Sequence, residues 1–174
     1  MMKKRNIPIF ALSLLSLSFL TLGGCGFTPV HQGQGSFAGQ SYANLRIEAL
    51  AGENPDDKEA GFDIKQSMID RIGQGSGEHI LEISPRLNQR RLGISGDDIA
   101  SRFEISLQAD YKLIEDKTGD ILDKGRLSSK TSFGAPADPF GRIAAEEDAA
   151  KRIASDIADD LVIVLSKYYA KTSS

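Results

Sequence analysis

Cysteine and histidine are nearly missing from this chain of 174 residues, which contains one cysteine and two histidines. A single cysteine excludes an intramolecular disulfide, and neither His31 nor His79 has a second ligand-type residue at metal-binding spacing. The chain also lacks a Ser-His-Asp set with a supporting motif, a phosphate-binding loop and a zinc signature. We therefore expect no metal, no cofactor and no enzymatic activity.

An excess of positive charge is missing as well. Lys and Arg number 21 against 24 Asp and Glu, which gives a formal net charge of −3. That balance disfavours bulk binding to nucleic acid. An anionic ligand would have to meet a local basic patch.

Long apolar runs are absent except near the N-terminus, where Ile9–Leu20 follows the basic residues 3–5 and precedes Leu22-Gly23-Gly24-Cys25. This order is typical of a secretory signal and too short for a spanning helix. We predict a signal peptide over residues 1–24.

The one cysteine, Cys25, follows the predicted cleavage site, as a bacterial lipoprotein requires. Its thiol would carry a diacylglycerol and its new amino group an acyl chain such as palmitate. Each buried CH₂ contributes about 0.8 kcal/mol to such an anchor. The alternative is an ordinary secretory signal with a chance cysteine. Cleavage removes three basic residues, so a net charge of −3 becomes −6 on the remaining 150 residues, a chain of one-domain size.

The rest of the chain divides into a tether, a domain and a tail. Residues 25–42 are rich in Gly, Gln and Ser and indicate a lipidated flexible tether. Residues 43–170 carry the periodic patterns of a single domain, and 171–174 form a short tail.

The first half of the domain predicts a strand, a helix and a second strand. Residues 43–50 alternate apolar and polar side chains, and residues 53–56 supply helix-start chemistry. A helix with Phe62 on its apolar stripe then runs to the glycines at 73–77. Residues 79–88 alternate again, and Pro85 indicates an edge or a bulge.

The second half predicts two more strands and a long helix. Residues 89–100 are interpreted as a long hairpin connection, and residues 103–114 form the clearest strand. Gly119 can supply the positive φ of the next turn, and a weaker strand follows over 121–133. An apolar stripe from Ile143 to Tyr168 predicts the last helix.

These elements predict an α+β fold. It is a two-layer sandwich in which two helices pack on one face of a four-stranded mixed sheet, in the order β-α-β-β-β-α. The other sheet face has nothing in the chain to cover it. It would face water or a partner with polar walls through four side chains of the clearest strand: Glu104, Ser106, Gln108 and Lys112.

Three segments of the chain have a recognisable sequence. The first is Gly24-Cys25-Gly26-Phe27-Thr28-Pro29-Val30, the second is residues 109–113 followed by Gly119 and the strand to Ser132-Phe133, and the third is the alanine-rich segment from Ala144 to Tyr169. In this order they resemble the start, the central hairpin and the final helix of the LptE family of lipopolysaccharide-assembly lipoproteins, in its alpha-proteobacterial form.

The resemblance implies an outer-membrane lipoprotein on the periplasmic side that is not an enzyme. Such proteins plug and help assemble the large barrel LptD and bind lipopolysaccharide during its delivery to the outer leaflet. Gly26 after the cysteine agrees with outer-membrane sorting. A barrel interior is polar, so the uncovered sheet face would suit it.

Basic residues are the candidates for lipopolysaccharide contact. Arg90 and Arg91 lie at a predicted strand tip near Arg86 and Arg102, and arginine suits bidentate phosphate binding. The alternative is a solvated tip that keeps the sheet end soluble, and no single arginine carries over from the family.

Two further basic features complete the candidates. Lys124, Arg126 and Lys130 form a row on one strand, although lysines that protect an edge strand would look the same. Arg142 lies near the start of the last helix, where a cation opposes the helix dipole.

Two other functions remain open. The first is an auxiliary lipoprotein of another envelope lipid transporter, with an inner-membrane or solute-binding partner. The second is a periplasmic enzyme acting on envelope polymers, which would need a convergent acid, base or nucleophile.

Overall fold

The computed structural model describes residues 42–50, 52, 54–94, 100–134, 136 and 138–172. The predicted signal peptide, Cys25, His31 and nearly all of the predicted tether lie outside these residues. Predictions about them stay predictions. Within the described part, no helix combines the length and the apolar character needed to cross a membrane.

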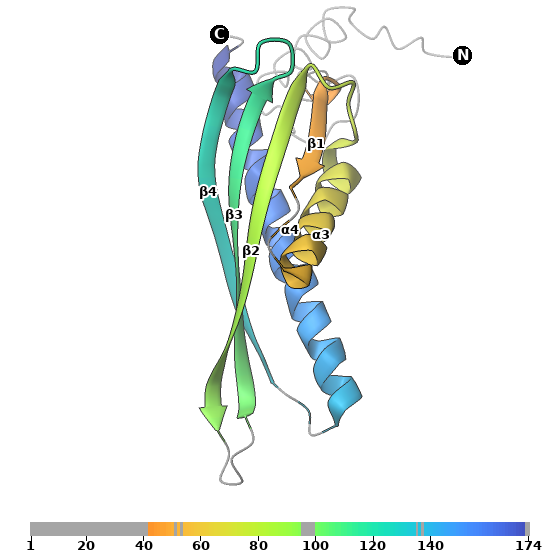
Figure 1. Ribbon diagram of the computed structural model, residues 1–174, viewed down its shortest axis with the longest axis vertical. Helices are drawn as coiled ribbons and strands as arrows, with labels where there is room; N and C mark the ends of the chain where they lie inside the picture. The colour runs from red at the N-terminus through yellow and green to blue at the C-terminus, as the bar shows by residue number, and fades with distance from the viewer. Residues whose placement is uncertain are drawn as a thin grey trace, which may run out of the picture. The chain divides into compact units, whose positions relative to one another are not determined.

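The domain contains one four-stranded sheet in the order β1-β2-β3-β4. The strands are β1 (Leu45–Ala49), β2 (His79–Ile94), β3 (Ala100–Glu115) and β4 (Ile121–Gly134). β1 pairs with β2 in parallel, and the other pairs are antiparallel. Helices α3 (Pro55–Ile72) and α4 (Pro139–Thr172) both lie on one face of the sheet (Figure 1). The predicted α+β sandwich and its element order are therefore confirmed.

The ends of α3 follow from local sequence. Asn54 accepts a hydrogen bond from the N–H of Asp57 at 2.8 Å, and Pro55 occupies the first turn, where its missing N–H has no cost. Gly73, with φ of 80°, ends the helix as predicted. Phe62 was expected on the apolar stripe and is 63% exposed. That expectation is wrong because the buried stripe passes through Ala60, Ile64 and Met68. Phe62 is two positions from Ala60 and from Ile64, so it points about 200° around the helix from both.

The core lies between the helices and the facing side of the sheet. Alternate residues of β3 point into it, and they meet a stripe of α4 that repeats every three or four residues. The following core side chains are at most 1% exposed: Ile105, Leu107, Leu113, Ile153, Ile157, Leu161 and Leu165. Each large side chain buried in this way contributes about 1.5–3 kcal/mol. Tyr168 packs partly against the core, as expected, and Tyr169 beside it is more deeply buried.

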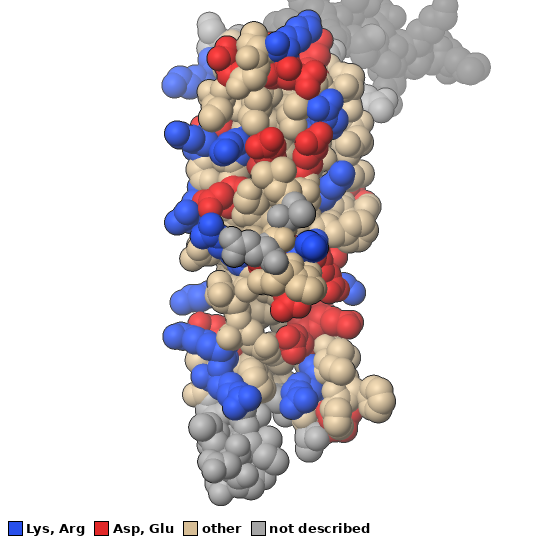
Figure 2. All heavy atoms as spheres, viewed as in Figure 1, with Lys and Arg blue, Asp and Glu red and all other residues tan. Residues whose placement is uncertain are grey.

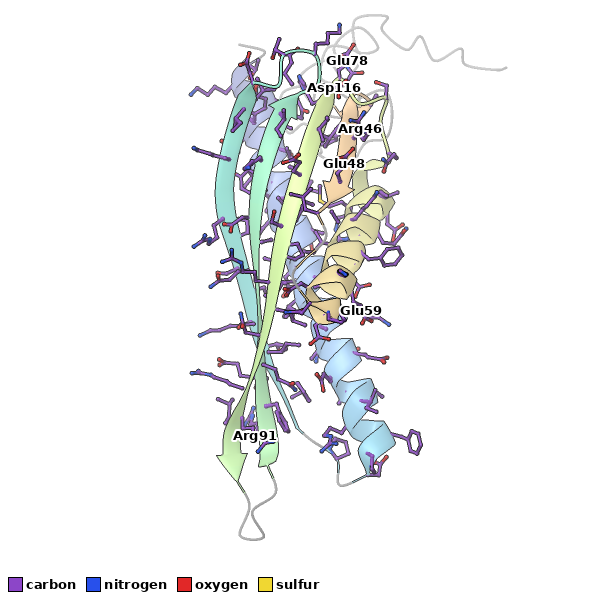
Figure 3. The ribbon with its side chains drawn as sticks, in the orientation of Figure 1. Arg46, Glu48, Glu59, Glu78, Arg91 and Asp116 are labelled. Atoms are coloured by element: carbon purple, nitrogen blue, oxygen red, sulfur yellow. The ribbon has the colours of Figure 1, made fainter. Side chains whose placement is uncertain are left out.

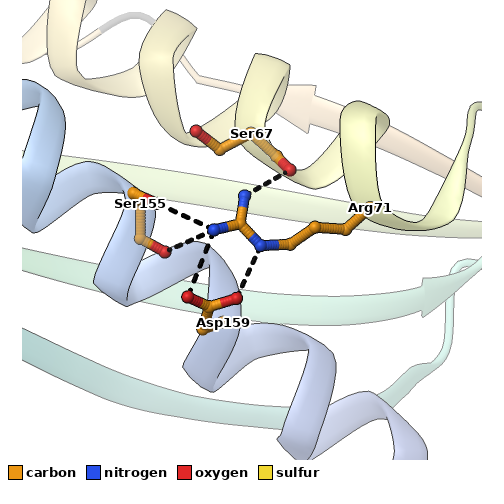
Figure 4. Close-up of polar contacts among 4 residues, drawn as sticks. All are labelled: Ser67, Arg71, Ser155 and Asp159. Carbon is orange, nitrogen blue, oxygen red and sulfur yellow. Dashed lines mark hydrogen bonds and ion pairs between the residues drawn. The ribbon is translucent and has the colours of Figure 1, made fainter. Parts of the chain in front are cut away.

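Arg71 joins the two helices (Figure 4). Its Nε and Nη2 donate to the two carboxylate oxygens of Asp159, at 2.6 and 3.1 Å. The same guanidinium donates to Ser155 Oγ at 2.7 Å and to the carbonyl of Ser67 at 2.7 Å. A bidentate pair of this kind fixes both distance and orientation, so Arg71 sets how α3 lies along α4.

The edge of β2 is exposed beyond the end of β1 and is capped by a side chain. The last β1–β2 pair joins Ala49 to Ile83. Pro85, which has no N–H to donate, comes directly after this point, so the predicted edge position is confirmed for this half of β2. The N–H of Leu87 then donates to Asp57 Oδ1 at 2.7 Å. Gly61 lets α3 approach, because a Cβ there would lie 3.1 Å from Pro85 Cγ.

The two hairpins of the meander differ in how well their sequences predicted them. Gly119 has φ of 76°, as the second turn requires. Residues 89–94, by contrast, continue β2 to Ile94 and are not a hairpin connection. Residues 90–92 are exposed, so they show no alternation of buried and solvated side chains from which a strand could be predicted.

Candidate functional site: a cationic sheet face

The sheet face that points away from the helices, called the outward face below, is polar along β2, β3 and β4. Strand alternation and register bring its members into rows across the three strands. The four predicted β3 residues all lie on it: Glu104, Ser106, Gln108 and Lys112. Both helices pack on the other face, so no element among the described residues covers the outward face. That it faces a barrel stays a prediction.

The charged residues of the outward face are mostly cations. Among the described residues of β2, β3 and β4, seven are basic, namely Arg86, Arg90, Arg102, Lys112, Lys124, Arg126 and Lys130, and three are acidic, namely Glu82, Glu104 and Asp110. β1 adds Arg46 and Glu48, which form an ion pair with each other. The whole chain has a net charge of −3. Figure 2 shows Lys and Arg side chains gathered along the margin of the molecule on the β4 side. This face therefore supplies the local basic patch that an acidic chain needs to bind an anion.

Two of the seven cations are neutralised within the face. Arg126 donates through Nε and Nη2 to the two carboxylate oxygens of Asp110, at 2.6 and 3.2 Å. Arg90 Nε lies 2.8 Å from Glu104 Oε1. The hydrogen bond from Arg126 lowers the pKa of Asp110, and the charge of Arg86 adds to this effect. To bind lipopolysaccharide as predicted, Arg126 and Arg90 would therefore have to release these carboxylates and bind the incoming anion instead.

Lys112 and Lys124 have the opposite situation. They are direct cross-strand partners on β3 and β4, both are exposed, and neither makes an ion pair among the described residues. Like charges directly opposite each other destabilise a sheet. Glu82 lies opposite Lys112 on the other side, on β2, and offsets part of this repulsion. An anion between the two ammonium groups would relieve the remainder.

The lysine pair lines a shallow basin of about 640 Å³ on the outward face. Its lining comes from all three long strands: Glu82, Ser84, Arg86, Asp110, Tyr111, Lys112, Lys124, Gly125 and Arg126. Four cations and two carboxylates thus surround it. Ammonium and guanidinium groups are the usual donors to phosphate, so the basin is suited to a phosphorylated ligand.

The remaining predicted cations do not gather in the basin. Lys130 lies on the outward face further along β4, opposite Ser106. Arg91 lies near the far end of β2 (Figure 3). Its partner Phe103 points toward the helix side, so Arg91 and Arg90 point to opposite faces. Arg90 and Arg91 therefore do not share one surface, although both lie near the end of β2. Their contact with lipopolysaccharide stays a prediction.

Arg142 is also separate from the outward face. It is exposed in the first turns of α4, which covers the other side of the sheet. Its backbone N–H donates to the carbonyl of Asp138 at 3.2 Å. Ligand contact by Arg142 stays a prediction, and it would need a ligand that reaches around the end of the sheet.

Sequence reasoning missed the pairing of Lys112 with Lys124 and the place of Arg86 in the lining of the same basin. Counting back from the turn at residues 116–120 would pair Lys112 with Asp123, because the β3–β4 register shifts by one residue between Leu113 and Ile114. The pairing of the two lysines therefore could not be predicted from the turn. Among the described residues, no three His, Cys, Asp or Glu side chains are arranged to share a metal ion.

Comparison with known proteins identifies the family of this chain. The family model "LptE: Lipopolysaccharide-assembly" matches residues 42–165. The chain belongs to the LptE family. The family resemblance is thereby confirmed over residues 42–165, which exclude the segment 24–30, and membership assigns the chain to lipopolysaccharide assembly in the cell envelope. The LptE family is one of non-enzymatic lipoproteins.

Solved structures show the same fold at low sequence identity. A lipoprotein from Caulobacter crescentus CB15 has a TM-score of 0.60 and 23% identity, covering 77% of this chain and 96% of that one. Rare lipoprotein B from Shewanella oneidensis has a TM-score of 0.54 and 10% identity, covering 75% and 98%. At these identities the likeness concerns the LptE fold alone. No curated protein matches the chain.

Proposed function

We propose that this LptE-family chain is a lipid-anchored outer-membrane subunit on the periplasmic side. In this role it plugs and helps assemble an LptD-type barrel and binds lipopolysaccharide through the basin on its outward face. Cys25 carries the anchor, no cofactor takes part and the chain catalyses no reaction. The family match supports the process, and the lysine pair is the observation that carries ligand binding.

The lysine pair distinguishes ligand binding from protection of a sheet edge. Lysines on an edge strand prevent pairing with other chains, which accounts for Lys124 and Lys130 on β4. It does not account for Lys112, since β3 is paired on both sides. We assign this position to a phosphate or acidic sugar of lipopolysaccharide. Bound between Lys112 and Lys124 with Arg86 nearby, the anion would relieve the repulsion between the two lysines.

The neutral part of the outward face is assigned to the barrel. Ser106 and Gln108 lie between the basin and the far end of β3, beside Ser128 on β4. Hydroxyl and amide groups can exchange hydrogen bonds with the polar lining of a barrel lumen. Glycolipid and barrel would then occupy adjacent parts of one face.

Ligand binding is tested with the double variant Lys112→Glu/Lys124→Glu, titrated with lipopolysaccharide as full lipoprotein in mild detergent. The control, Lys58→Glu/Lys171→Glu, changes the same number of charges on exposed helix positions. Charge-assisted hydrogen bonds contribute about 1.5–3 kcal/mol each, so we expect affinity to fall by roughly tenfold or more. An equal loss of affinity in both variants would show that only net charge matters and that the basin is not the binding site.

The barrel assignment is tested by purification through a C-terminal tag from outer membranes. We expect a heat-modifiable barrel at near-equal stoichiometry. Gln108→Trp should displace the barrel while lipopolysaccharide binding persists, and the control Gln66→Trp on α3 should displace nothing. A lone lipoprotein, or one bound to inner-membrane transport components, would replace this proposal with an auxiliary role in another lipid transporter.

A further inference from the structure

A second concave surface lies on the helix side of the sheet, where the first half of α3 faces α4. We call it the acidic groove. Its volume is about 270 Å³. Two helices and two strands line it: Asp56, Glu59, Ala60, Asp63, Leu87, Ile105, Ile143, Glu146, Glu147 and Ala150.

The floor of the acidic groove is apolar because small residues occupy the helix positions that face it. Ala60 on α3 and Ala150 on α4 leave space above Leu87 and Ile105, which larger side chains would fill. Ile143 forms one end of the floor and is 53% exposed. The groove is therefore open to solvent over an apolar surface.

The rim of the acidic groove consists of carboxylates from both helices. Asp56 lies in the first turn of α3, where the helix dipole stabilises a negative charge. Glu59 and Asp63 lie beyond that turn, and Figure 3 shows Glu59 on α3. Burial raises the pKa of Asp63, and the charge of Lys151 partly offsets this rise.

The α4 carboxylates of the rim lie outside the first turn of that helix. α4 begins at Pro139, and its first turn contains no acidic residue. Glu146 and Glu147 lie about two turns further on, so the dipole does not account for them. Sequence reasoning missed the rim, since its members come from helices that are distant in the chain.

An exposed apolar line on α4 lengthens the acidic groove. Phe140 is 85% exposed and precedes Ile143 by three residues, so both lie on the same side of the helix. Figure 1 shows this first part of α4 extending past the start of α3. The apolar surface thus continues beyond the pocket, which suits an extended segment better than a compact small molecule.

We propose that the acidic groove docks a cationic amphipathic segment of a partner protein. The apolar side of the segment lies on Leu87, Ile105 and Ile143, and its Lys or Arg side chains meet the carboxylate rim. This is the helix-in-groove mode of recognition, and the complementary charge of the rim selects the segment. The rim repels phosphates, so this site is distinct from the basin and extends beyond the proposed function.

The charge requirement is tested with a labelled synthetic helix of about four turns, or 14 residues, with leucines on one side and lysines beside them. Its binding to the full lipoprotein in detergent is followed by fluorescence anisotropy. Glu59→Lys/Glu146→Lys should weaken binding by roughly tenfold or more. The control Asp70→Lys/Asp160→Lys changes net charge equally and should change affinity less than about twofold. Equal loss in both, or no binding of the helix to the unaltered protein, would overturn the proposal.

The shape requirement is tested without changing any charge. Ala150→Leu fills the groove and should abolish binding of the synthetic helix while thermal stability is kept and lipopolysaccharide affinity is unchanged. Ala144→Leu, at an exposed position of the same helix, is the control. Undiminished binding to Ala150→Leu would show that the groove is not the docking surface.

The occupant in cells is identified by a photo-crosslinking residue at position 143 and peptide sequencing of the product. We expect a protein segment with apolar residues flanked by Lys or Arg, and we expect Glu59→Lys/Glu146→Lys to remove the crosslink. Crosslinks confined to lipid, to a second copy of this chain or to an acidic segment would overturn the assignment. Lipopolysaccharide binding is measured on the same variants, so failure here is distinguishable from failure of the proposed function.

Discussion

At the scale of single residues, neighbours in sequence can have unrelated roles. Arg90 pairs with Glu104 on the outward face, whereas Arg91 lies on the helix side of the sheet. Lys112 and Lys124 are twelve positions apart and lie directly opposite each other. The electrostatic character of a site on this sheet is therefore set by register as well as by the spacing of residues in the chain.

The two adjacent arginines give a prediction at this scale. We expect Arg90→Glu to weaken lipopolysaccharide binding by a few fold, because it leaves Glu104 unpaired on the same face as the basin. Arg91→Glu should change the affinity less than about twofold, since its side chain points the other way. Titrating both variants with lipopolysaccharide checks this, and a larger effect of Arg91→Glu would move the site to the helix side.

A second residue-scale prediction concerns the anchor. Cys25→Ser removes the thiol that would accept the diacylglycerol, so the protein should remain unprocessed, become soluble or be mislocalised. Membrane fractionation and the intact mass of the purified protein check this. Normal processing and outer-membrane recovery of the variant would favour an ordinary secretory signal.

At the scale of elements, most of the fold was predictable from sequence because its elements have one buried side. The alternation of β3 and the stripe of α4 follow from that burial, whereas the start of α3 was predictable from local capping chemistry. The distal part of β2 and the start of α4 were missed, since both project where neither side is fully covered. The basin and the acidic groove were missed for another reason: each is formed by residues that only strand register or helix packing brings together.

The Asp57 carboxylate gives a prediction about the joint between α3 and β2. Asp57→Ala leaves the N–H of Leu87 without its partner, and we expect a loss of about 1–3 kcal/mol in the free energy of unfolding. Asp57→Asn keeps an acceptor oxygen and should cost less. Asp56→Ala, at the exposed neighbouring position, removes only a favourable dipole contact of about 0.3–1 kcal/mol. Urea denaturation measures all three, and equal losses at both positions would contradict the edge-capping role.

At the scale of the whole domain, the stability of the fold depends on tyrosines buried near the start of β1 and the end of α4. Tyr42 Oη lies 2.6 Å from Ser166 Oγ, and Tyr169 Oη lies 3.0 Å from His79 Nδ1. Burial raises the pKa of both phenols. The folded state therefore keeps them neutral at a pH where the unfolded chain ionises.

This raised pKa predicts alkaline destabilisation. The contribution of each phenol is complete below its unfolded pKa of about 10 and is lost as pH rises toward the folded value. The slope is at most about 1.4 kcal/mol per pH unit for each phenol. Urea midpoints measured across this range should fall more steeply for the native sequence than for Tyr42→Phe/Tyr169→Phe. Identical slopes would assign the alkaline transition to other groups.

The place of β1 in the sheet has a consequence for how the chain assembles. β2, β3 and β4 are joined by short connections, while Leu45 reaches its partner His79 only after α3 has been formed and packed. The connection from β1 through α3 to β2 is longer than the hairpin connections, so closing it has a larger entropic cost. This favours early formation of the antiparallel meander β2–β3–β4 and late docking of β1. A lipid-anchored tether would then pull on the part of the sheet that joins last. We expect backbone amides of β1 to exchange hydrogen with solvent faster than those of β3, so strain on the tether would open the domain from β1 and leave the meander folded.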